Sequence, residues 1–235
     1  MIIDAETCTG CRRCIPYCTV GAIKLNGKSV FIDQDTCVEC GVCLRSEVCQ
    51  VDSIGQPELS WPRVLRAQFS DPAVRHPTGV AGRGTEEMKT NDVTGRFKEG
   101  EVGFGFEFGR PGVGTTFADV EKATRALAEH VEFSKDNPVT LLIDPKTGRL
   151  QDNRVRRERV LSAIIECKTS EEKAVEVIRI IQTIAGKIDT VFSVDAINRC
   201  VDGTIPVKKH LDKAGIHVRV NGKTCIGLGR PLADI

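Results

Sequence analysis

The chain has 235 residues, a hydrophobic content of 40% and a formal net charge of +1. This length allows one large or two small domains, each with a core of its own. Aromatic residues make up only 5% of the chain. With so few stacking side chains and no excess of positive charge, the composition argues against a nucleic-acid-binding protein. Apolar runs stay below the roughly 18 residues that span a bilayer, and the acidic N-terminus lacks a signal-peptide pattern.

Cysteine is concentrated near the N-terminus, where eight of the eleven cysteines lie in the first fifty residues. They form two runs, Cys8-x-x-Cys11-x-x-Cys14-x-x-x-Cys18 and Cys37-x-x-Cys40-x-x-Cys43-x5-Cys49. Iron–sulfur clusters are held by thiolates on tight turns, in bacterial proteins with the spacing C-x2-C-x2-C-x3-C-P. The first run has the full cysteine spacing, and in the second run the fourth cysteine is displaced by two residues.

The two runs lie in a duplicated segment. The pattern Ile-Asp-x-x-Thr-Cys occurs at residues 3–8 and again at residues 32–37, an offset of 29. An internal repeat is what a two-fold pair of cluster-binding halves would show. Residues 1–56 therefore resemble a bacterial-type ferredoxin with two [4Fe–4S] clusters, a likeness that covers about a quarter of the chain.

The resemblance implies a crossed ligand set, in which the fourth cysteine of each run serves the other cluster. One cluster would be held by Cys8, Cys11, Cys14 and Cys49, and the other by Cys37, Cys40, Cys43 and Cys18. From the residues alone, two alternatives stay open. A zinc ribbon also uses paired cysteines, usually two per half rather than a train of four. A disulfide framework would require an oxidising compartment and thiols that are less crowded.

The chain departs from the family pattern after each fourth cysteine, where Thr19 and Gln50 stand in place of proline. Because proline lacks an N–H, each of these residues adds a donor near a thiolate sulfur. Hydrogen bonds to cluster sulfurs are one determinant of the reduction potential. We therefore predict potentials somewhat above those of a proline-containing ferredoxin with the same exposure.

Two further features of the N-terminal part concern its shape and charge. Residues 22–32 are predicted to form a short hairpin, because Asn26-Gly27 is a strong turn signal. Residues 1–58 carry five Lys or Arg and eight Asp or Glu. This excess of acidic residues predicts a face that docks on a basic patch of a partner.

Residues 59–100 contain several prolines and glycines and show no sustained periodicity. Two interpretations stay open, a flexible linker and an ordered arm that lies along the second domain or a partner subunit. The segment holds the only tryptophan, Trp61, together with Arg63 and Arg66. Because Trp and Arg are enriched in interface hot spots and uncommon in disordered spacers, the ordered arm is favoured.

From Glu101 the sequence predicts a globular domain. Residues 102–108 alternate Val or Phe with Gly or Glu, which predicts a strand whose glycine face allows close approach of another backbone or a ligand. A helix is expected from Thr116, with Asp119 completing a capping box and a buried stripe that reaches Val131.

The remaining elements alternate in a recognisable order. Strands are predicted at Val139–Ile143, Val160–Cys167 and Thr190–Val194, and a helix after a capping box formed by Thr169 and Glu172. Strand–helix–strand–strand–helix–strand predicts a ferredoxin-like α/β plait, an antiparallel four-stranded sheet with both helices on one face. A third helix near Thr204–Ala214 and strands near 216–220 and 224–228 would follow.

The expected fold class is therefore α+β. Residues 1–58 are predicted to form a two-cluster bacterial ferredoxin domain, 59–100 an extended arm or linker, and 101–235 the plait domain for partner docking or assembly. No catalytic residue is predicted. The other cysteines are expected to be small buried residues: Cys167, Cys200 and Cys225. The histidines lack a partnered acid or nucleophile at a readable spacing: His76, His130, His210 and His217.

Two glycine-framed turns leave a weaker hypothesis. Gly112-Val113-Gly114 runs into the start of the predicted helix, where backbone N–H groups bind anions. Gly109-Arg110-Pro111 recurs as Gly229-Arg230-Pro231, and two such arginines could hold a carboxylate. Ordinary structural turns are the favoured interpretation of both.

The sequence favours an iron–sulfur electron-transfer subunit that passes single electrons through two [4Fe–4S] clusters to or from a partner oxidoreductase, with a separate electron donor. The alternative is a redox-sensing or regulatory protein whose C-terminal domain forms a homo-oligomer through its sheet or binds a small anionic ligand. A self-contained oxidoreductase is least favoured, because flavin, nicotinamide and nucleophile–base motifs are not found. Reduced thiols and oxygen-sensitive clusters predict the cytoplasm of an anaerobic or microaerobic cell.

Overall fold

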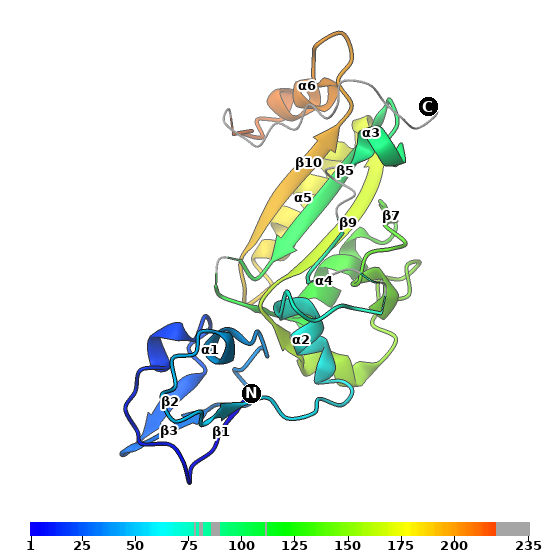
Figure 1. Ribbon diagram of the computed structural model, residues 1–235. Helices are drawn as coiled ribbons and strands as arrows, with labels where there is room; N and C mark the ends of the chain where they lie inside the picture. The colour runs from blue at the N-terminus through cyan, green and yellow to red at the C-terminus, as the bar shows by residue number, and fades with distance from the viewer. Residues whose placement is uncertain (78, 80–81, 86–89, 111, 220–235) are drawn as a thin grey trace.

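A computed structural model describes residues 1–77, 79, 82–85, 90–110 and 112–219. Two hydrophobic cores organise these residues, a smaller one from residues 1–54 and a larger one from residues 65–211. Figure 1 shows the residues of the smaller core as a lobe of its own, in blue, which we call the N-terminal lobe. The remainder forms the large lobe. None of the described helices is both long and apolar enough to cross a membrane.

The N-terminal lobe consists of short elements around the cysteine runs. Strand β1 (Ile2–Ile3) pairs antiparallel with β4 (Ile54–Gly55), so both ends of the duplicated segment meet. Strands β2 (Ile23–Asn26) and β3 (Ser29–Ile32) form the predicted hairpin, with Gly27 at a φ of 61° in its turn. A 3-10 helix, η1 (Ile15–Tyr17), lies in the first run, and α1 (Val42–Arg45) lies in the second.

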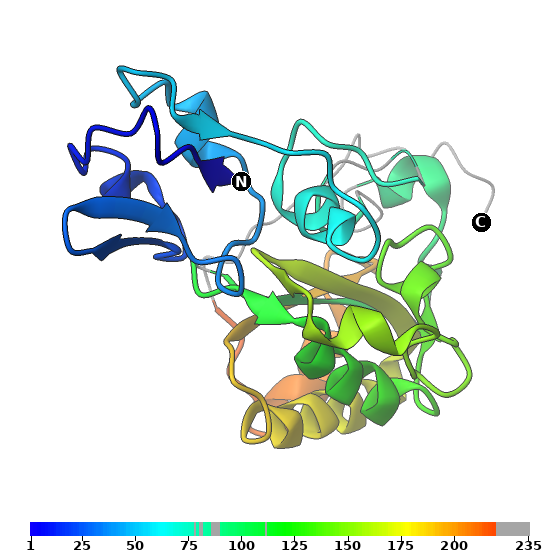
Figure 2. The ribbon, with the colours of Figure 1, turned by 90° about the horizontal axis from the view of Figure 1, so that it is seen from below.

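Residues 59–100 contain α2 (Val64–Ser70) and α3 (Asn91–Thr94). Leu65 and Phe69 of α2 belong to the larger core, and the Phe69 ring meets Phe117 edge-on with 5.1 Å between centroids. The Phe97 ring lies on Gly103, where an added Cβ would be only 2.3 Å from it. The glycine face predicted on this strand thus receives an aromatic ring from the arm. Figure 2 shows α2 on the opposite side of the sheet from α4 and α5.

The large lobe is built on a four-stranded sheet with the order β10-β5-β9-β7, in which all neighbours are antiparallel. Its strands are β5 (Glu101–Phe108), β7 (Glu132–Phe133), β9 (Ala163–Ser170) and β10 (Phe192–Asn198). Helices α4 (Phe117–Leu127) and α5 (Ala174–Ala185) cover one face. The phenylalanines of β5 are fully buried in the core, as the alternation predicted: Phe104, Phe106 and Phe108. The mixed helix-and-sheet class is confirmed.

The predicted strand at Val139–Ile143 is wrong, so this segment does not supply a strand of the expected plait. The segment forms a 3-10 helix, η3 (Thr140–Leu142), and the edge position is taken by the shorter β7. The reason is the side chain of Asn137. Its Oδ1 accepts from the Val139 N–H at 2.8 Å, and its Nδ2 donates to the Ile164 carbonyl at 3.0 Å. These bonds tie the chain into a turn before a ladder can form.

The two predicted capping boxes differ in outcome. Thr116 Oγ1 accepts from the Asp119 N–H at 3.2 Å, as expected, although α4 ends at Leu127 rather than near Val131. The box at Thr169 is wrong. Because β9 stays paired with β5 as far as Ser170, Thr169 lies in the strand and donates to the His130 carbonyl at 3.0 Å. The next helix starts later, after η5 (Glu171–Lys173).

The connections complete the large lobe. Strand β6 (Thr115–Thr116) pairs with β8 (Arg159–Val160), and η4 (Asn153–Arg157) precedes β8. The predicted third helix is found as α6 (Pro206–Lys213). Residues 216–219 carry no strand, contrary to expectation, and the strand predicted near 224–228 lies outside the described residues.

Candidate iron–sulfur sites

The N-terminal lobe contains two cavities that are each lined by four cysteines. The first, which we call the outer site, gathers Cys8, Cys11, Cys14 and Cys49. The second, the inner site, gathers Cys18, Cys37, Cys40 and Cys43. Each cavity thus takes three thiols from one run and the fourth from the other. Apolar side chains also line the cavities. They include Val30 and Ile54 in the outer site and Ile23 and Ile32 in the inner site.

The repeated Ile-Asp-x-x-Thr-Cys pattern is one turn used twice. In the first copy Thr7 Oγ1 donates to Asp4 Oδ2 at 3.0 Å, and in the second Thr36 Oγ1 donates to Asp33 Oδ2 at 3.1 Å. The N–H of the first cysteine in each run donates to the carbonyl oxygen of the same aspartate, at 3.0 Å and 2.9 Å. The turn therefore fixes where each run begins relative to its cavity.

The fourth cysteines are held alike despite their different spacing. The Ala22 N–H donates to Cys18 Sγ at 3.0 Å, and the Ser53 N–H donates to Cys49 Sγ at 3.2 Å. In both copies the donor comes four residues after the cysteine. The two extra residues of the second copy therefore lie between Cys43 and Cys49. Thiols in an apolar cavity with N–H groups aimed at sulfur fit the donor set of an iron–sulfur cluster.

The predicted donors at Thr19 and Gln50 act differently from expectation. Thr19 lies with its hydroxyl 3.5 Å from Cys40 Sγ, a sulfur of the inner site. Among the described contacts, Gln50 makes no hydrogen bond to a sulfur. The N–H groups that reach the two fourth cysteines are instead those of Ala22 and Ser53.

Left-handed residues bend both cysteine loops around their cavities. We call the loop of residues 8–14 the outer loop and the loop of residues 37–43 the inner loop. Gly10 and Arg12 have φ values of 68° and 67° in the first run, and Glu39 and Gly41 have 55° and 67° at the equivalent positions of the second. A Cβ on Gly10 would lie 2.5 Å from the Lys28 carbonyl oxygen, so glycine is required there. Glu39 adopts the same region because its carboxylate is bound.

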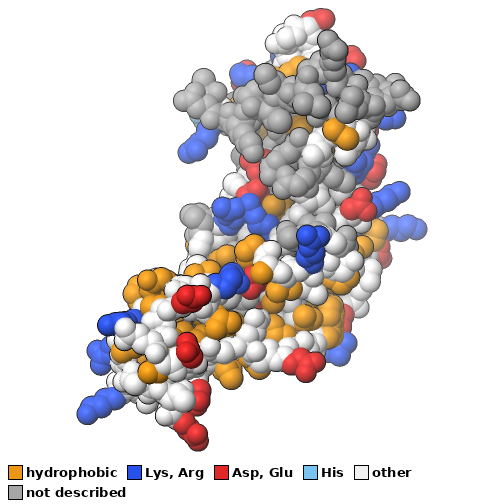
Figure 3. Space-filling model, viewed as in Figure 1, with side chains coloured by type: hydrophobic (Ala, Val, Ile, Leu, Met, Phe, Trp, Pro, Cys, Tyr) orange, Lys and Arg blue, Asp and Glu red, His pale blue; other side chains and the backbone are white. Residues whose placement is uncertain are grey.

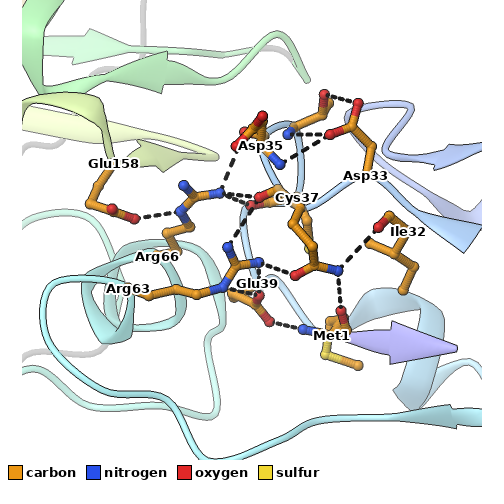
Figure 4. A network of polar contacts seen from close by, with 11 residues as sticks. Met1, Ile32, Asp33, Asp35, Cys37, Glu39, Arg63, Arg66 and Glu158 are labelled. Carbon is orange, nitrogen blue, oxygen red and sulfur yellow. Dashed lines mark hydrogen bonds and ion pairs between the residues drawn. The ribbon is translucent and has the colours of Figure 1, made fainter. Parts of the chain in front are cut away.

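Glu39 is fully buried, and its carboxylate joins the inner loop to α2 (Figure 4). Arg63 donates to Glu39 Oε1 from Nε at 2.9 Å, and the Met1 amino group pairs with Oε2. Burial acts to raise the pKa of Glu39, but the hydrogen bonds from Met1 and Arg63 outweigh it and hold that pKa below its usual value. The carboxylate is therefore ionised when folded.

Burial also governs the cysteine thiols. It raises the pKa of Cys43 to about 11, and the neighbouring Cys40 and Cys37 add to the effect. The pKa of Cys14 is raised as well, again chiefly by burial. For Cys49, burial is outweighed by backbone N–H groups, and its pKa is lowered. Since metal ligation requires thiolates, loading these sites releases protons.

The other sequence candidates lie apart from the two sites. Cys167 is buried in the larger core, Cys200 is exposed contrary to expectation, and Cys225 lies outside the described residues. His76 is buried beside Phe69, and His130 Nδ1 lies 3.0 Å from Glu176. His210 and His217 are exposed. In the described part of the chain, no three His, Cys, Asp or Glu side chains are placed to hold a single metal ion.

The glycine turn before α4 is closed on itself. The N–H groups of Val113 and Gly114 both donate to the Gly109 carbonyl, at 3.1 Å and 2.9 Å, so they are used within the turn. Arg110 is exposed, and Arg230 lies outside the described residues. The pairing of Arg110 with a second arginine therefore falls outside the described residues.

Sequence reasoning marked Arg63 and Arg66 as interface residues without finding their target. They lie three residues apart at the start of α2, a spacing that places both on one helix face. That face meets the inner loop, as Figure 4 shows. The spacing of the two arginines is visible in the sequence, but the sequence does not show that their partner loop lies 24 to 32 residues upstream.

Comparisons with known proteins agree with this geometry. Residues 1–24 match the family model of the 4Fe-4S binding domain. A "Ferredoxin-like protein in vnf region" of Azotobacter chroococcum mcd 1 is 44% identical over 62 residues, which cover 24% of this chain and 92% of that protein. No solved structure matches the chain. An iron–sulfur cluster and a role in electron transfer follow for the N-terminal lobe. Through this lobe, the chain belongs to the ferredoxin-like family of 4Fe-4S proteins.

Proposed function

We propose that the chain is an electron-transfer subunit that carries two [4Fe–4S] clusters and passes single electrons between a donor and a partner oxidoreductase. The observation that supports this most is the sorting of eight thiols into two cavities of four. Cys8, Cys11, Cys14 and Cys49 would hold the outer cluster. Cys37, Cys40, Cys43 and Cys18 would hold the inner one.

A bound cluster would supply reversible one-electron chemistry, and the residues of the chain would do the rest. The two Ile-Asp-x-x-Thr-Cys turns orient the thiols. The N–H groups of Ala22 and Ser53 stabilise negative charge on two of the sulfurs. The apolar linings limit the access of water to both cavities.

We further propose that residues 59–100 and 101–235 are the parts that seat the ferredoxin domain, 1–58, on its partner. Leu65 and Phe69 anchor α2 in the large lobe, while Arg63 binds the inner loop. Figure 3 shows hydrophobic side chains on the face that carries α1 and α2. Leu44 of α1 and Trp61 before α2 are exposed by 38% and 43%. Exposed apolar surface next to a redox site suits a docking protein.

Iron and sulfide analysis of the anaerobically purified full chain tests the cluster count, with about eight irons and eight sulfides expected per polypeptide. About four irons would reduce the proposal to a single cluster. Affinity purification from the native source tests the partner, and we expect a stoichiometric oxidoreductase to be retained. Turnover of a substrate by the isolated chain with an artificial donor would contradict the proposed role.

A further inference from the structure

The inner cysteine loop is held by guanidinium groups. Arg66 Nη1 donates to the Cys37 carbonyl oxygen at 2.7 Å, and Arg45 Nη2 donates to the Cys40 carbonyl oxygen at 2.7 Å. Arg66 also donates to the carbonyl oxygen of Gln34 at 2.8 Å. Its side chain is only 7% exposed, so its charge is poorly screened by water. A permanent positive charge thus touches a residue that supplies a cluster thiol.

The counter-charge comes from the large lobe. Arg66 Nε lies 2.5 Å from Glu158 Oε2, and the Glu158 side chain is 12% exposed. The carbonyl oxygen of Glu158 accepts from the N–H of Phe117, the first residue of α4, at 3.1 Å. Figure 4 shows the guanidinium between the inner loop and this carboxylate. The Arg66 guanidinium therefore lies next to Cys37, and the Glu158 carboxylate lies on the far side of the guanidinium.

No such pair contacts the outer loop within the described part of the chain. Its first cysteine, Cys8, is equivalent to Cys37 in the repeat, and Cys11 is equivalent to Cys40. Among the described residues, neither of these carbonyl oxygens accepts a hydrogen bond from a lysine or arginine. The two halves have the same cysteine pairing, but as far as the structure describes the chain, only the inner half contacts buried charge from outside the lobe.

We propose that the Arg66–Glu158 pair sets the reduction potential of the inner cluster, with Arg66 raising it and Glu158 lowering it. This inference rests on the two-cluster function proposed above. Reduction adds one negative charge to a cluster, so a nearby cation stabilises the reduced form and a nearby anion destabilises it. Because the interior of a protein screens charge less than water does, a buried charge close to the cluster acts on the reduction equilibrium. Arg66 is a positioning residue, since it acts through the Cys37 loop.

The experiment is a redox titration of the full chain, followed by electron paramagnetic resonance under anaerobic conditions. Three variants each remove one charge: Arg66→Gln, Glu158→Gln and, as the control, Arg154→Gln. Arg154 forms an exposed ion pair with Asp152 close to Glu158 in sequence. Arg66→Gln is expected to lower one midpoint by about tenfold in the reduction equilibrium, which is about 59 mV for one electron. Glu158→Gln should raise the same midpoint, and Arg154→Gln should change neither.

Midpoint shifts of opposite sign distinguish an electrostatic effect from a loss of structure. If the pair had only a structural role, removing either partner would shift the midpoint in the same direction. Shifts of the same sign, or no shift in either variant, would overturn the inference. If Arg66→Gln loses iron, Glu158→Gln decides alone, and a midpoint that is lowered or unchanged counts against the pair. Iron analysis of the unaltered chain distinguishes failure of this inference from failure of the proposed function. If the chain holds two clusters and the variants leave the midpoints unchanged, only this inference is refuted. If it holds a single cluster, the proposed two-cluster function is refuted as well.

Discussion

The two copies of the cysteine turn lie in unlike surroundings. In the outer site Cys11 is exposed and Cys8 is half-buried, whereas in the inner site Cys37, Cys40 and Cys43 are all buried. The inner loop is covered by α2 and bound by its arginines. The duplication supplies the same thiol geometry twice, and the contacts made by the rest of the chain distinguish the two copies. A pair of sites with one ligand set can therefore differ in exposure, charge and role.

One pair of equivalent residues shows how this difference arises. Gly10 and Glu39 hold the same place between the first two cysteines of their runs, and both are left-handed. At Gly10 the Lys28 carbonyl leaves no room for a side chain. At Glu39 the side chain is kept because Arg63 binds it. The same backbone turn thus makes a close contact with the hairpin in the outer loop, whereas in the inner loop it is an attachment point for the large lobe.

The largest predicted effect comes from removing one ligand. Cys43→Ala and Cys11→Ala should each lower the iron content from about eight toward about four per chain, because each deprives one cubane of a thiolate. Cys43→Ala should also lower the thermal midpoint more, since Cys43 lies in the buried core of the lobe. The control is Cys200→Ala, at an exposed cysteine outside both sites. A loss of iron in that control would contradict the assignment.

Removing the anchor of the inner loop should have the next largest effect. Glu39→Ala leaves Arg63 and the Met1 amino group without their buried carboxylate, at a cost of roughly 3–5 kcal/mol. For a chain of this size that is a fall of about 6–20 °C in the thermal midpoint. Scanning calorimetry of the anaerobic protein measures it. An unchanged midpoint would show that the inner loop does not depend on α2.

A methyl group on the outer loop should cost somewhat less. Gly10→Ala places a Cβ 2.5 Å from the Lys28 carbonyl oxygen in a left-handed residue. The expected loss of stability therefore exceeds the roughly 1–2 kcal/mol that the left-handed conformation costs by itself. The matched control is Gly21→Ala, which is also left-handed but has no atom within 4 Å of the added Cβ. Equal thermal midpoints for the two variants would mean that the close approach to Lys28 carries no energy.

The smallest predicted effect concerns one hydroxyl. Thr19→Val removes the group 3.5 Å from Cys40 Sγ while keeping the shape of the side chain. A lost hydrogen bond of about 1 kcal/mol corresponds to roughly a fivefold shift of the reduction equilibrium toward the oxidised form. Only the inner midpoint should move in the redox titration. A shift of the outer midpoint instead would contradict the contact of Thr19 with the inner site.

Local patterns in the sequence predicted what local physics decides. The ferredoxin resemblance implied two crossed sets of cysteines, and those sets line the two cavities. The alternation along residues 102–108 predicted β5 and its buried phenylalanines. The strand predicted at Val139–Ile143 failed because the side chain of Asn137 bonds to a carbonyl 27 residues away. The pair of Arg66 and Glu158 spans 92 residues and joins α2 to the segment directly before β8. A contact of that kind leaves no periodic signal in a single chain.

The crossed pairing of the two runs is the central claim, and the iron content of two double variants tests it most directly. Cys18→Ala with Cys43→Ala removes two thiols of the inner site only. It should leave one unaltered outer cubane with about four irons and its own midpoint. Cys14→Ala with Cys18→Ala, two cysteines of the same run, should leave no unaltered cubane. The reverse pattern, with an intact cluster in the second variant and none in the first, would contradict the account.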